Sequence, residues 1–256
     1  IPVVTAWSTP GAAMLVASNA GVPLSDAIGA FVLTAAMTAV AGFSGLFERG
    51  MRRVPLALAS GLLGGVLLRF GMDVFVSMRT QMAMTLAMFL VYLCGRRWFP
   101  RYAVLATLLL GMSIAGASGL LHLDDVELRV ARPVFTMPSL SLAAIFGIAL
   151  PLFVVTMASQ NIPGIAVARA SGYEPPVSST IGWIGTTNIL LAPFGAYSLC
   201  MAAITAAICS GREAHPDPSK RYVASVFAGI FYMFTGVFGA TVAALFAAFP
   251  RELVLA

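Results

Sequence analysis

The sequence predicts an all-α polytopic membrane protein, and its composition and the lengths of its apolar blocks carry that prediction. Of the 256 residues, 59% are hydrophobic and 10% are charged, and the mean hydropathy is +0.93. A soluble domain carries about a quarter charged residues. The apolar residues also form repeated blocks of about 17 to 28 residues, each long enough to cross roughly 30 Å of hydrocarbon as a helix. A soluble fold is therefore excluded.

About ten apolar blocks alternate with charged or Pro/Gly-rich breaks, and each block predicts a helix. The blocks lie at roughly residues 3–19, 26–47, 55–70, 78–94, 102–120, 139–167, 177–192, 194–210 and 221–249, followed by a truncated block that opens at Pro250. Loops assigned alternately to two sides place ten basic side chains on one side and five on the other. The positive-inside rule orients the richer side to the cytoplasm. We expect the chain, which starts at Ile1 without a methionine, to be a fragment.

The charge and motif content argues against a nucleic-acid partner and against an enzyme. The net charge is +5, but the basic residues sit in short clusters between apolar blocks and form no continuous face. Cys94, Cys200 and Cys209 lack metal-ligand spacing and are interpreted as small packing residues. No hydrolase, P-loop or dinucleotide-binding motif occurs. We expect no catalytic residue, no metal and no cofactor.

Two breaks interrupt the apolar blocks. Pro10-Gly11 breaks the first block, and Pro193-Phe194-Gly195 separates the seventh from the eighth. Each break leaves free backbone groups within the membrane, where an unsatisfied amide costs several kcal/mol, so a break should line an enclosed or wet cavity. Binding sites of transporters are built in this way. The alternative is a proline kink repaired by neighbouring helices.

The first break carries four candidate substrate-binding residues: Trp7, Ser8, Thr9 and Gly11. The stretch is typical of a helix N-terminus, because hydroxyls precede a proline suited to the first turn. Free N–H groups and the positive end of the helix dipole there can hold a carboxylate without a charged side chain. Trp7 could supply an aromatic wall. Ordinary capping with an interfacial Trp is the alternative interpretation.

The second break and a polar run supply the other candidates. Phe194, Gly195 and Tyr197 combine close backbone approach with rings for stacking, although aromatic residues in apolar helices are more often packing residues. Ser159, Gln160 and Asn161 lie deep inside an apolar block, where polar groups are costly unless paired or wet. Interhelical hydrogen bonding is the alternative for this run. Acidic side chains are scarce at mid-depth, so no proton-carrying carboxylate is evident.

A weak internal repeat relates the two halves of the chain. Pro10-Gly11-Ala12 precedes an apolar Pro-Leu-Ala stretch at Pro55, and Gly195-Ala196 precedes a similar stretch at Leu253. The odd number of intervening segments would invert the two copies in the membrane, as in many secondary transporters. We expect one transmembrane domain, with about 1–138 late in a first repeat and about 139–256 early in a second. Chance similarity is the competing explanation.

Eight motifs resemble the BenE benzoate/proton symporter family over essentially the whole chain. They are TAWSTPGAA from Thr5, FERGMRR from Phe47, LLRFG from Leu67, LPLFVVTMASQNIPG from Leu150, APFGAY from Ala192, AAITAAIC from Ala202, EAHPDP from Glu213 and FPRELVLA from Phe249. The resemblance implies a multi-pass carrier of the bacterial inner membrane that imports benzoate with protons.

The resemblance also implies an architecture similar to uracil permease, with seven plus seven helices in inverted repeats. Half-helices occupy the third and tenth positions of that fold, and this chain would run from the third helix into the twelfth. By fold analogy, Ser159, Gln160 and Asn161 lie on the helix that contributes polar contacts. The glutamates of those permeases have no clear counterpart here, and neutral donors suit an anionic substrate better.

We therefore expect a secondary active transporter that holds the substrate carboxylate between two half-helix N-termini. Ser8, Thr9, Gln160 and Asn161 would donate hydrogen bonds, and the ring would lie among Trp7, Phe194 and Tyr197. One helix bundle would rock against the other around this site. The expected partners are an aromatic carboxylate, protons and the lipid bilayer, and a homodimer is left open. The rivals are a carrier for another organic anion or a nucleobase, a passive anion channel, and a structural or receptor membrane protein.

Overall fold

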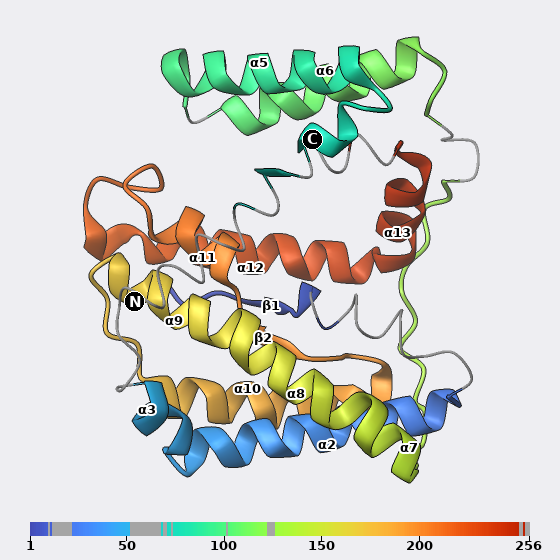
Figure 1. The fold of residues 1–256 in the computed structure, drawn as a ribbon, viewed down its shortest axis with the longest axis vertical. Helices are drawn as coiled ribbons and strands as arrows, with labels where there is room; N and C mark the ends of the chain where they lie inside the picture. Colours follow the sequence, from blue (N-terminus) through green and yellow to red (C-terminus); the bar gives the residue numbers. More distant parts are fainter. Residues whose placement is uncertain are drawn as a thin grey trace. The chain divides into compact units, whose positions relative to one another are not determined.

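The computed structural model describes residues 1–9, 11, 22–51, 68, 71–72, 74–100, 102–121, 126–250 and 253. In this part of the chain the regular structure is helical except for one sheet of two short strands (Figure 1). The chain divides into two compact units. The first combines Ile1–Leu63 with Pro133–Gly229, and the second combines Gly64–Arg132 with Ile230–Ala256. Each unit thus draws on both sides of residue 138, the predicted boundary between repeats.

The first unit contains both strands and most of the long helices. Its elements are β1 (Thr5–Trp7), α2 (Leu24–Phe43), α3 (Leu46–Met51), α7 (Leu142–Ala144), η1 (Ile145–Ala149), α8 (Leu150–Thr156), η2 (Met157–Asn161), α9 (Ile162–Ala170), α10 (Val177–Leu191), η3 (Ala192–Phe194), β2 (Leu199–Met201), α11 (Ala203–Ser210) and η4 (Pro218–Lys220). Helix α12 (Tyr222–Val237) begins in this unit.

Two of the described helices are long and apolar enough to cross a membrane. They are α2, with 20 residues, and the continuous helix Leu142–Ala170, with 29 residues. At about 1.5 Å per residue, 20 residues reach about 30 Å, the thickness of the hydrocarbon core. These helices confirm the blocks predicted at 26–47 and 139–167, and the chain is an all-α membrane protein apart from its two short strands. The block at 55–70 lies outside the described residues except for Leu68.

The long helix accommodates two prolines by widening its turns. The π-helical turns η1 and η2 end two residues before Pro151 and Pro163, respectively. A proline lacks the N–H of the regular ladder and crowds the preceding turn, and a π-turn relieves both problems. The second of these turns carries Ser159, Gln160 and Asn161. The polar run therefore lies where the backbone departs from regular α-helix.

Small residues allow α2 and α10 to pack backbone against backbone. A Cβ atom added to Gly185 would lie 2.3 Å from the backbone nitrogen of Ala39, and one added to Gly42 would lie 2.2 Å from that of Gly182. Two carboxylates also join this region to other segments. Asp26, in the first turn of α2, accepts a hydrogen bond from the Ser139 hydroxyl. Glu48, on α3, accepts hydrogen bonds from the backbone N–H and hydroxyl of Ser178 at the start of α10.

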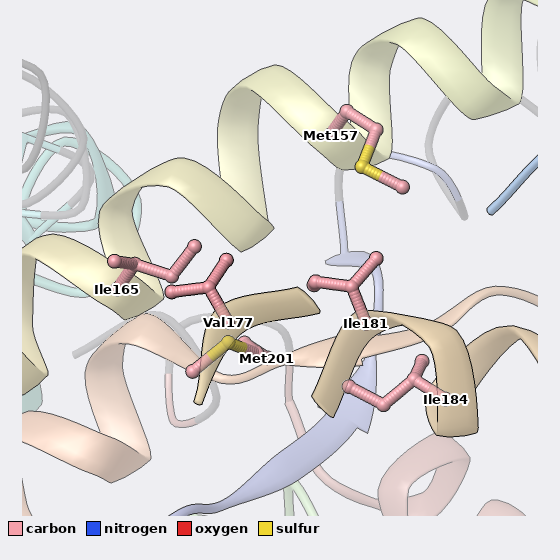
Figure 2. Close-up of a cluster of buried hydrophobic side chains, with 6 residues drawn as sticks. All are labelled: Met157, Ile165, Val177, Ile181, Ile184 and Met201. Carbon is pink, nitrogen blue, oxygen red and sulfur yellow. The ribbon is translucent and has the colours of Figure 1, made fainter. Parts of the chain in front are cut away.

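An apolar cluster joins the long helix, α10 and β2. It contains Met157, Ile165, Val177, Ile181, Ile184 and Met201, whose side chains converge in Figure 2. All six are at most 7% exposed. At about 1.5–3 kcal/mol for burying each large apolar side chain, this cluster is a main source of stability for the first unit.

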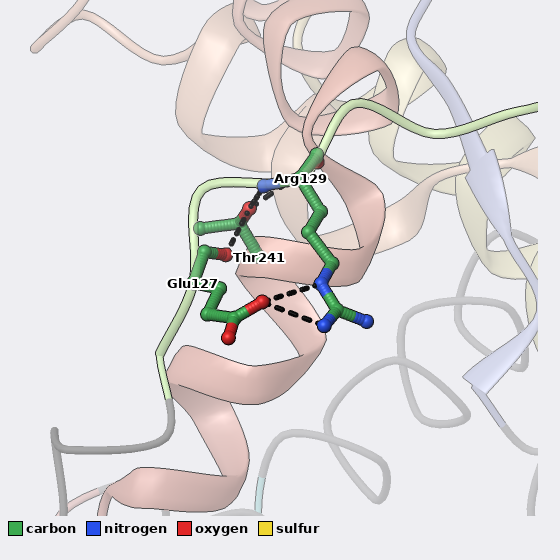
Figure 3. A network of polar contacts seen from close by, with 3 residues as sticks. All are labelled: Glu127, Arg129 and Thr241. Carbon is green, nitrogen blue, oxygen red and sulfur yellow. Dashed lines mark hydrogen bonds and ion pairs between the residues drawn. The ribbon is translucent and has the colours of Figure 1, made fainter.

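The second unit contains a helical hairpin and a short helix. Helices α5 (Met82–Trp98) and α6 (Ala103–Ala117) pack around Met84, Met88 and Ala115. Near α13 (Gly239–Ala248), the backbone N–H of Arg129 donates to Thr241 Oγ1 at 2.7 Å. Arg129 also pairs with Glu127 at 2.6 Å (Figure 3). Their side chains are 69% and 67% exposed, so this ion pair contributes little in water.

One apolar block that was predicted as a single helix is not continuous in the structure. The block at 221–249 is two helices, α12 and α13, which bend by 88° at Phe238. Gly236 and Gly239 flank the bend. Glycine costs about 1 kcal/mol in a helix interior relative to Ala, which weakens the helix on both sides of the break. An apolar composition alone could not reveal this bend.

Replacing Gly185 with Ala should destabilise the first unit by about 1–3 kcal/mol, because the new methyl group must displace the backbone of α2. Thermal unfolding of the purified full-length protein in detergent measures the effect. Gly229→Ala on α12 is the matched control, since a Cβ there meets nothing within 4 Å. Equal melting temperatures for the two variants would contradict the close packing of α2 on α10.

Candidate functional site

The strands β1 and β2 form an antiparallel ladder in the first unit. Thr5 pairs with Met201, and Trp7 pairs with Leu199. The Ser8 N–H donates to the Ser198 carbonyl at 3.0 Å beyond one end, and the Ala202 N–H donates to the Val4 carbonyl at 2.9 Å beyond the other. Each strand leads directly into a helical segment. The ladder therefore joins two places where apolar segments leave helical geometry.

Two carboxamides pair with the outer edge of β2. Asn188 of α10 accepts from the Leu199 N–H and donates to the Leu199 carbonyl, both at 2.9 Å. Asn161 of η2 accepts from the Met201 N–H at 2.9 Å. Asn161 and Asn188 are 0% and 4% exposed. The side chains thus replace a third strand, and they satisfy backbone groups that would be costly to leave unpaired in an apolar interior.

The first helix N-terminus lies where the sequence predicts it. Ser8 accepts a hydrogen bond from the Gly11 N–H at 3.1 Å, which is the geometry of an N-cap. Thr9 and Gly11 are helical, Thr9 is exposed, and residues 12–21 lie outside the described part of the chain. Ser8 is 0% exposed. Its hydroxyl therefore acts inside the protein as a cap.

The second helix N-terminus lies later in the chain than the sequence predicted, which corrects the eighth block. Helix α11 begins at Ala203 rather than near residue 194, and no side chain caps it. Pro193 and Phe194 instead lie in η3, which closes α10. Gly195 adopts φ +89° and donates to the Ala192 carbonyl at 2.8 Å, as a glycine that terminates a helix does. The break thus extends over a turn and a strand.

The polar run on η2 divides into paired and unpaired side chains. Asn161 pairs with β2, and the Ser159 hydroxyl donates to the Val155 carbonyl of its own helix at 2.6 Å. For this run, the sequence left open either substrate binding or hydrogen bonding between segments. In this structure the Asn161 side chain makes a hydrogen bond between segments. Gln160 is half-buried, and its side chain has no hydrogen-bond partner among the described residues. Within the described part of the chain, its amide is therefore available to bind a ligand.

Gln160 lies on the long helix between two positions that contact the ladder or its flanking residues. It is one turn after Thr156, which contacts Ser8 and Ser198, and one turn before Gly164. A Cβ at Gly164 would lie 2.8 Å from the Cβ of Met201. The long helix therefore approaches both ends of β2, one turn before and one turn after Gln160.

The candidate aromatic residues lie on or beside the ladder. Trp7 is 56% exposed on β1. The ring of Tyr197, directly before Ser198, lies 5.9 Å from that of Phe31. The ring of Phe194 lies 5.7 Å from that of Phe135. Trp7 and Tyr197 are thus brought to the same end of the ladder, whereas Phe194 belongs to the turn that closes α10.

The ladder separates the two helix N-termini. The paired positions at its ends, Ser8 with Ser198 and Val4 with Ala202, are four residue steps apart along each strand. That separation is about 13 Å at about 3.3 Å per residue. One carboxylate group cannot contact both N-termini across this distance. An elongated anion could bind at one N-terminus and extend along the ladder toward the other.

Sequence reasoning missed Asn188, Thr156 and Ser198 as functional candidates. Asn188 is the only carboxamide in α10, and a lone carboxamide in an apolar helix is a signal that could have identified it. The significance of Ser198 depends on the ladder register, which the sequence does not reveal. Among the described residues, no group of three or more His, Cys, Asp or Glu side chains could hold a metal ion.

Replacing Asn188 with Leu should destabilise the protein by about 2–5 kcal/mol, because the buried N–H and C=O of Leu199 both lose their partner. Thr187→Leu is the matched control on the exposed face of the same helix. Thermal unfolding of the full-length protein with and without each substitution gives the comparison. A loss no larger than that of the control would mean that the carboxamide does not support the strand.

The chain is similar to known membrane proteins along its whole length. The family described as BenE, benzoate membrane transport protein, matches residues 1–256. The chain is 46% identical over 250 residues to the inner membrane protein YdcO of Escherichia coli, which covers 98% of this chain and 64% of that protein. It is 35% identical over 255 residues to the benzoate membrane transport protein of Acinetobacter baylyi, covering 100% of this chain and 65% of that protein.

The chain therefore spans just under two thirds of the length of these curated relatives. No solved structure matches. Both relatives are named as membrane proteins and neither as an enzyme, in agreement with the prediction from the motifs. The match to the family covers every motif from which the resemblance was inferred. The chain belongs to the BenE family of benzoate membrane transport proteins.

Proposed function

We propose that the full-length protein is a secondary active transporter that imports benzoate, or a similar aromatic carboxylate, together with protons across the cytoplasmic membrane. The observation that carries the proposal is the strand ladder with its two helix N-termini, found in a chain of a benzoate transport family. Antiparallel strands are also what two inverted repeats would supply.

The chemistry of the ladder suits an anion with an aromatic ring. Helix α11 begins without a side-chain cap, so its first N–H groups and the positive end of its dipole can accept a carboxylate. The described candidate side chains in or near the ladder are neutral: Trp7, Ser8, Thr156, Asn161, Asn188, Tyr197 and Ser198, and Gln160 on the same helix as Thr156 and Asn161. A carboxylate held by neutral donors can be released again more easily than one held by Arg or Lys.

We place the carboxylate at the N-terminus of α11, where the Gln160 amide can donate to it. The ring extends along the ladder toward Trp7 and Tyr197. Ser8 and Asn161 contribute by fixing backbone, because both are 0% exposed. The remaining predicted residues border this space: Thr9 and Gly11 at the first helix N-terminus, Ser159 beside Gln160, and Phe194 and Gly195 on the segment leading to Tyr197.

The proton coupling and the conformational change are proposed from features of the whole chain rather than from the ladder alone. The two compact units each combine distant parts of the chain, which supports transport by movement of one helix bundle against another. The described residues at the ladder include no Asp or Glu. The proton would therefore be carried by the substrate itself or by a group elsewhere in the full-length protein. A homodimer stays a prediction.

The proposed function is tested with the full-length protein in liposomes, by following labelled benzoate. An inward proton gradient should drive accumulation above the external concentration, and an ionophore that collapses the gradient should abolish it. Uptake that only equilibrates would indicate a passive channel. Strong competition by nucleobases or by non-aromatic anions would indicate another substrate, and no uptake above empty liposomes would contradict benzoate transport.

Replacing Gln160 with Ala should raise the KM for benzoate about tenfold or more, because a hydrogen bond to a charged group contributes about 1.5–3 kcal/mol. Gln160→Glu should be at least as damaging at neutral pH, since it places a negative charge beside the carboxylate. Ser113→Ala on α6 is the control, because the Ser113 hydroxyl donates to the Leu109 carbonyl of its own helix and lies in the second unit. Unchanged uptake kinetics for both Gln160 variants would remove this residue from the site.

A further inference from the structure

Three buried hydroxyls connect three separate segments of the first unit. Thr156 Oγ1, at the end of α8, lies 3.1 Å from Ser8 Oγ and 2.7 Å from Ser198 Oγ. Ser8 directly follows β1 and caps the first helix, and Ser198 directly precedes β2. The exposed fractions of Ser8, Thr156 and Ser198 are 0%, 4% and 6%. The cluster is therefore buried within the first unit.

The hydrogen bonds of the cluster follow one order. Thr156 donates to Ser8, which uses the only hydroxyl proton of Thr156. Ser198 must then donate to Thr156 across the 2.7 Å contact. Ser8 also accepts from the Gly11 N–H. The chain of donors thus runs from the start of β2, through the long helix, to the N-cap of the first helix, and each bond polarises the next.

Two other buried threonines bond only within their own helices, whereas Thr34 of α2 donates to the Ala149 carbonyl of another segment at 3.0 Å. Thr38 and Thr107 donate to carbonyls four residues earlier in their own helices, at 2.9 and 2.8 Å. Such bonds satisfy a hydroxyl without joining segments. Thr156 instead reaches two segments that lie 148 and 42 residues away in the sequence.

The backbone at Ser198 supports a role beyond packing. Ser198 has φ +42°, and it is the only non-glycine residue with positive φ in the described part of the chain. This conformation costs free energy for a residue with a Cβ and persists only when the surroundings impose it. The imposing contacts are the Ser198 hydroxyl bond to Thr156 and the carboxamide of Asn188 on the next residue.

We propose that Thr156 and Ser198 are positioning residues for the site, a role that rests on the proposed function. Together with Ser8 they form a hydroxyl lock, which holds the ladder and the first helix N-terminus in register with the long helix that carries Gln160. Gln160 lies one turn beyond Thr156, so the lock sets its distance from the ladder. The lock itself does not touch the substrate.

Thr156→Val tests the lock, because it removes the hydroxyl and keeps the shape. In full-length protein it should raise the KM for benzoate about tenfold while changing Vmax less than twofold. Thr156→Ser restores the hydroxyl and should return the KM to within twofold of the original. Thr38→Val, which removes a buried hydroxyl bonded only to its own helix, should leave the KM unchanged.

Hydrogen–deuterium exchange provides a readout that does not depend on transport. The peptide containing Gly11 should exchange at least tenfold faster in Thr156→Val than in Thr38→Val. If Thr156→Val does not reach the membrane, Ser198→Ala interrupts the same bond and should give the same two changes. An unchanged KM, or a Thr156→Ser variant as impaired as Thr156→Val, would overturn the lock. Absence of benzoate uptake by the unsubstituted protein would contradict the proposed function, and the exchange comparison would then decide the lock alone.

Discussion

The requirement that every backbone amide and carbonyl be paired inside an apolar protein governs this structure. Helices satisfy it by themselves, but the two short strands do not. Each strand gains one neighbour from the other, and the remaining edge of β2 is paired by Asn188 and Asn161. With those pairs in place, two apolar segments can leave helical geometry at the same location. Helices then begin beside the strands, and the free backbone N–H groups at their N-termini suit an anionic substrate.

Close packing of the surrounding helices makes this arrangement possible. Gly164 lets the long helix approach Met201, and glycines in α2 and α10 bring those helices into backbone contact. Because α10 packs against α2, the carboxamide of Asn188 is presented to β2 from a fixed direction. The π-turn before Pro163 places Asn161, which pairs with β2, next to Gln160, which has no hydrogen-bond partner among the described residues. Neighbouring residues of one turn thus have different roles: Asn161 supports the strand, and Gln160 is the candidate substrate contact.

The sequence predicted several helices and the first helix N-terminus, but it did not predict the strands, the bend after α12 or the position of the second N-terminus. Apolar block length identified α2 and the helix Leu142–Ala170, and hydroxyls before Pro10 identified the helix N-terminus at Ser8. Pro193 and Gly195 suggested a second N-terminus but terminate α10 instead, because glycine with positive φ ends helices as readily as it opens a site. The ladder has only three residues per strand, too few for a periodic pattern. The roles of Asn188, Thr156 and Ser198 follow from that ladder and could not be predicted without it.

The central claim is that an aromatic carboxylate binds along the ladder, with its charged end at α11. An experimental structure of the full-length protein with 4-bromobenzoate tests this claim most directly, since the bromine can be located by its anomalous signal. We expect the carboxylate beside Gln160 and the first N–H groups of α11, and the bromine near Trp7 and Tyr197. A bromine position outside the first unit, or a carboxylate bound away from both helix N-termini, would contradict the account.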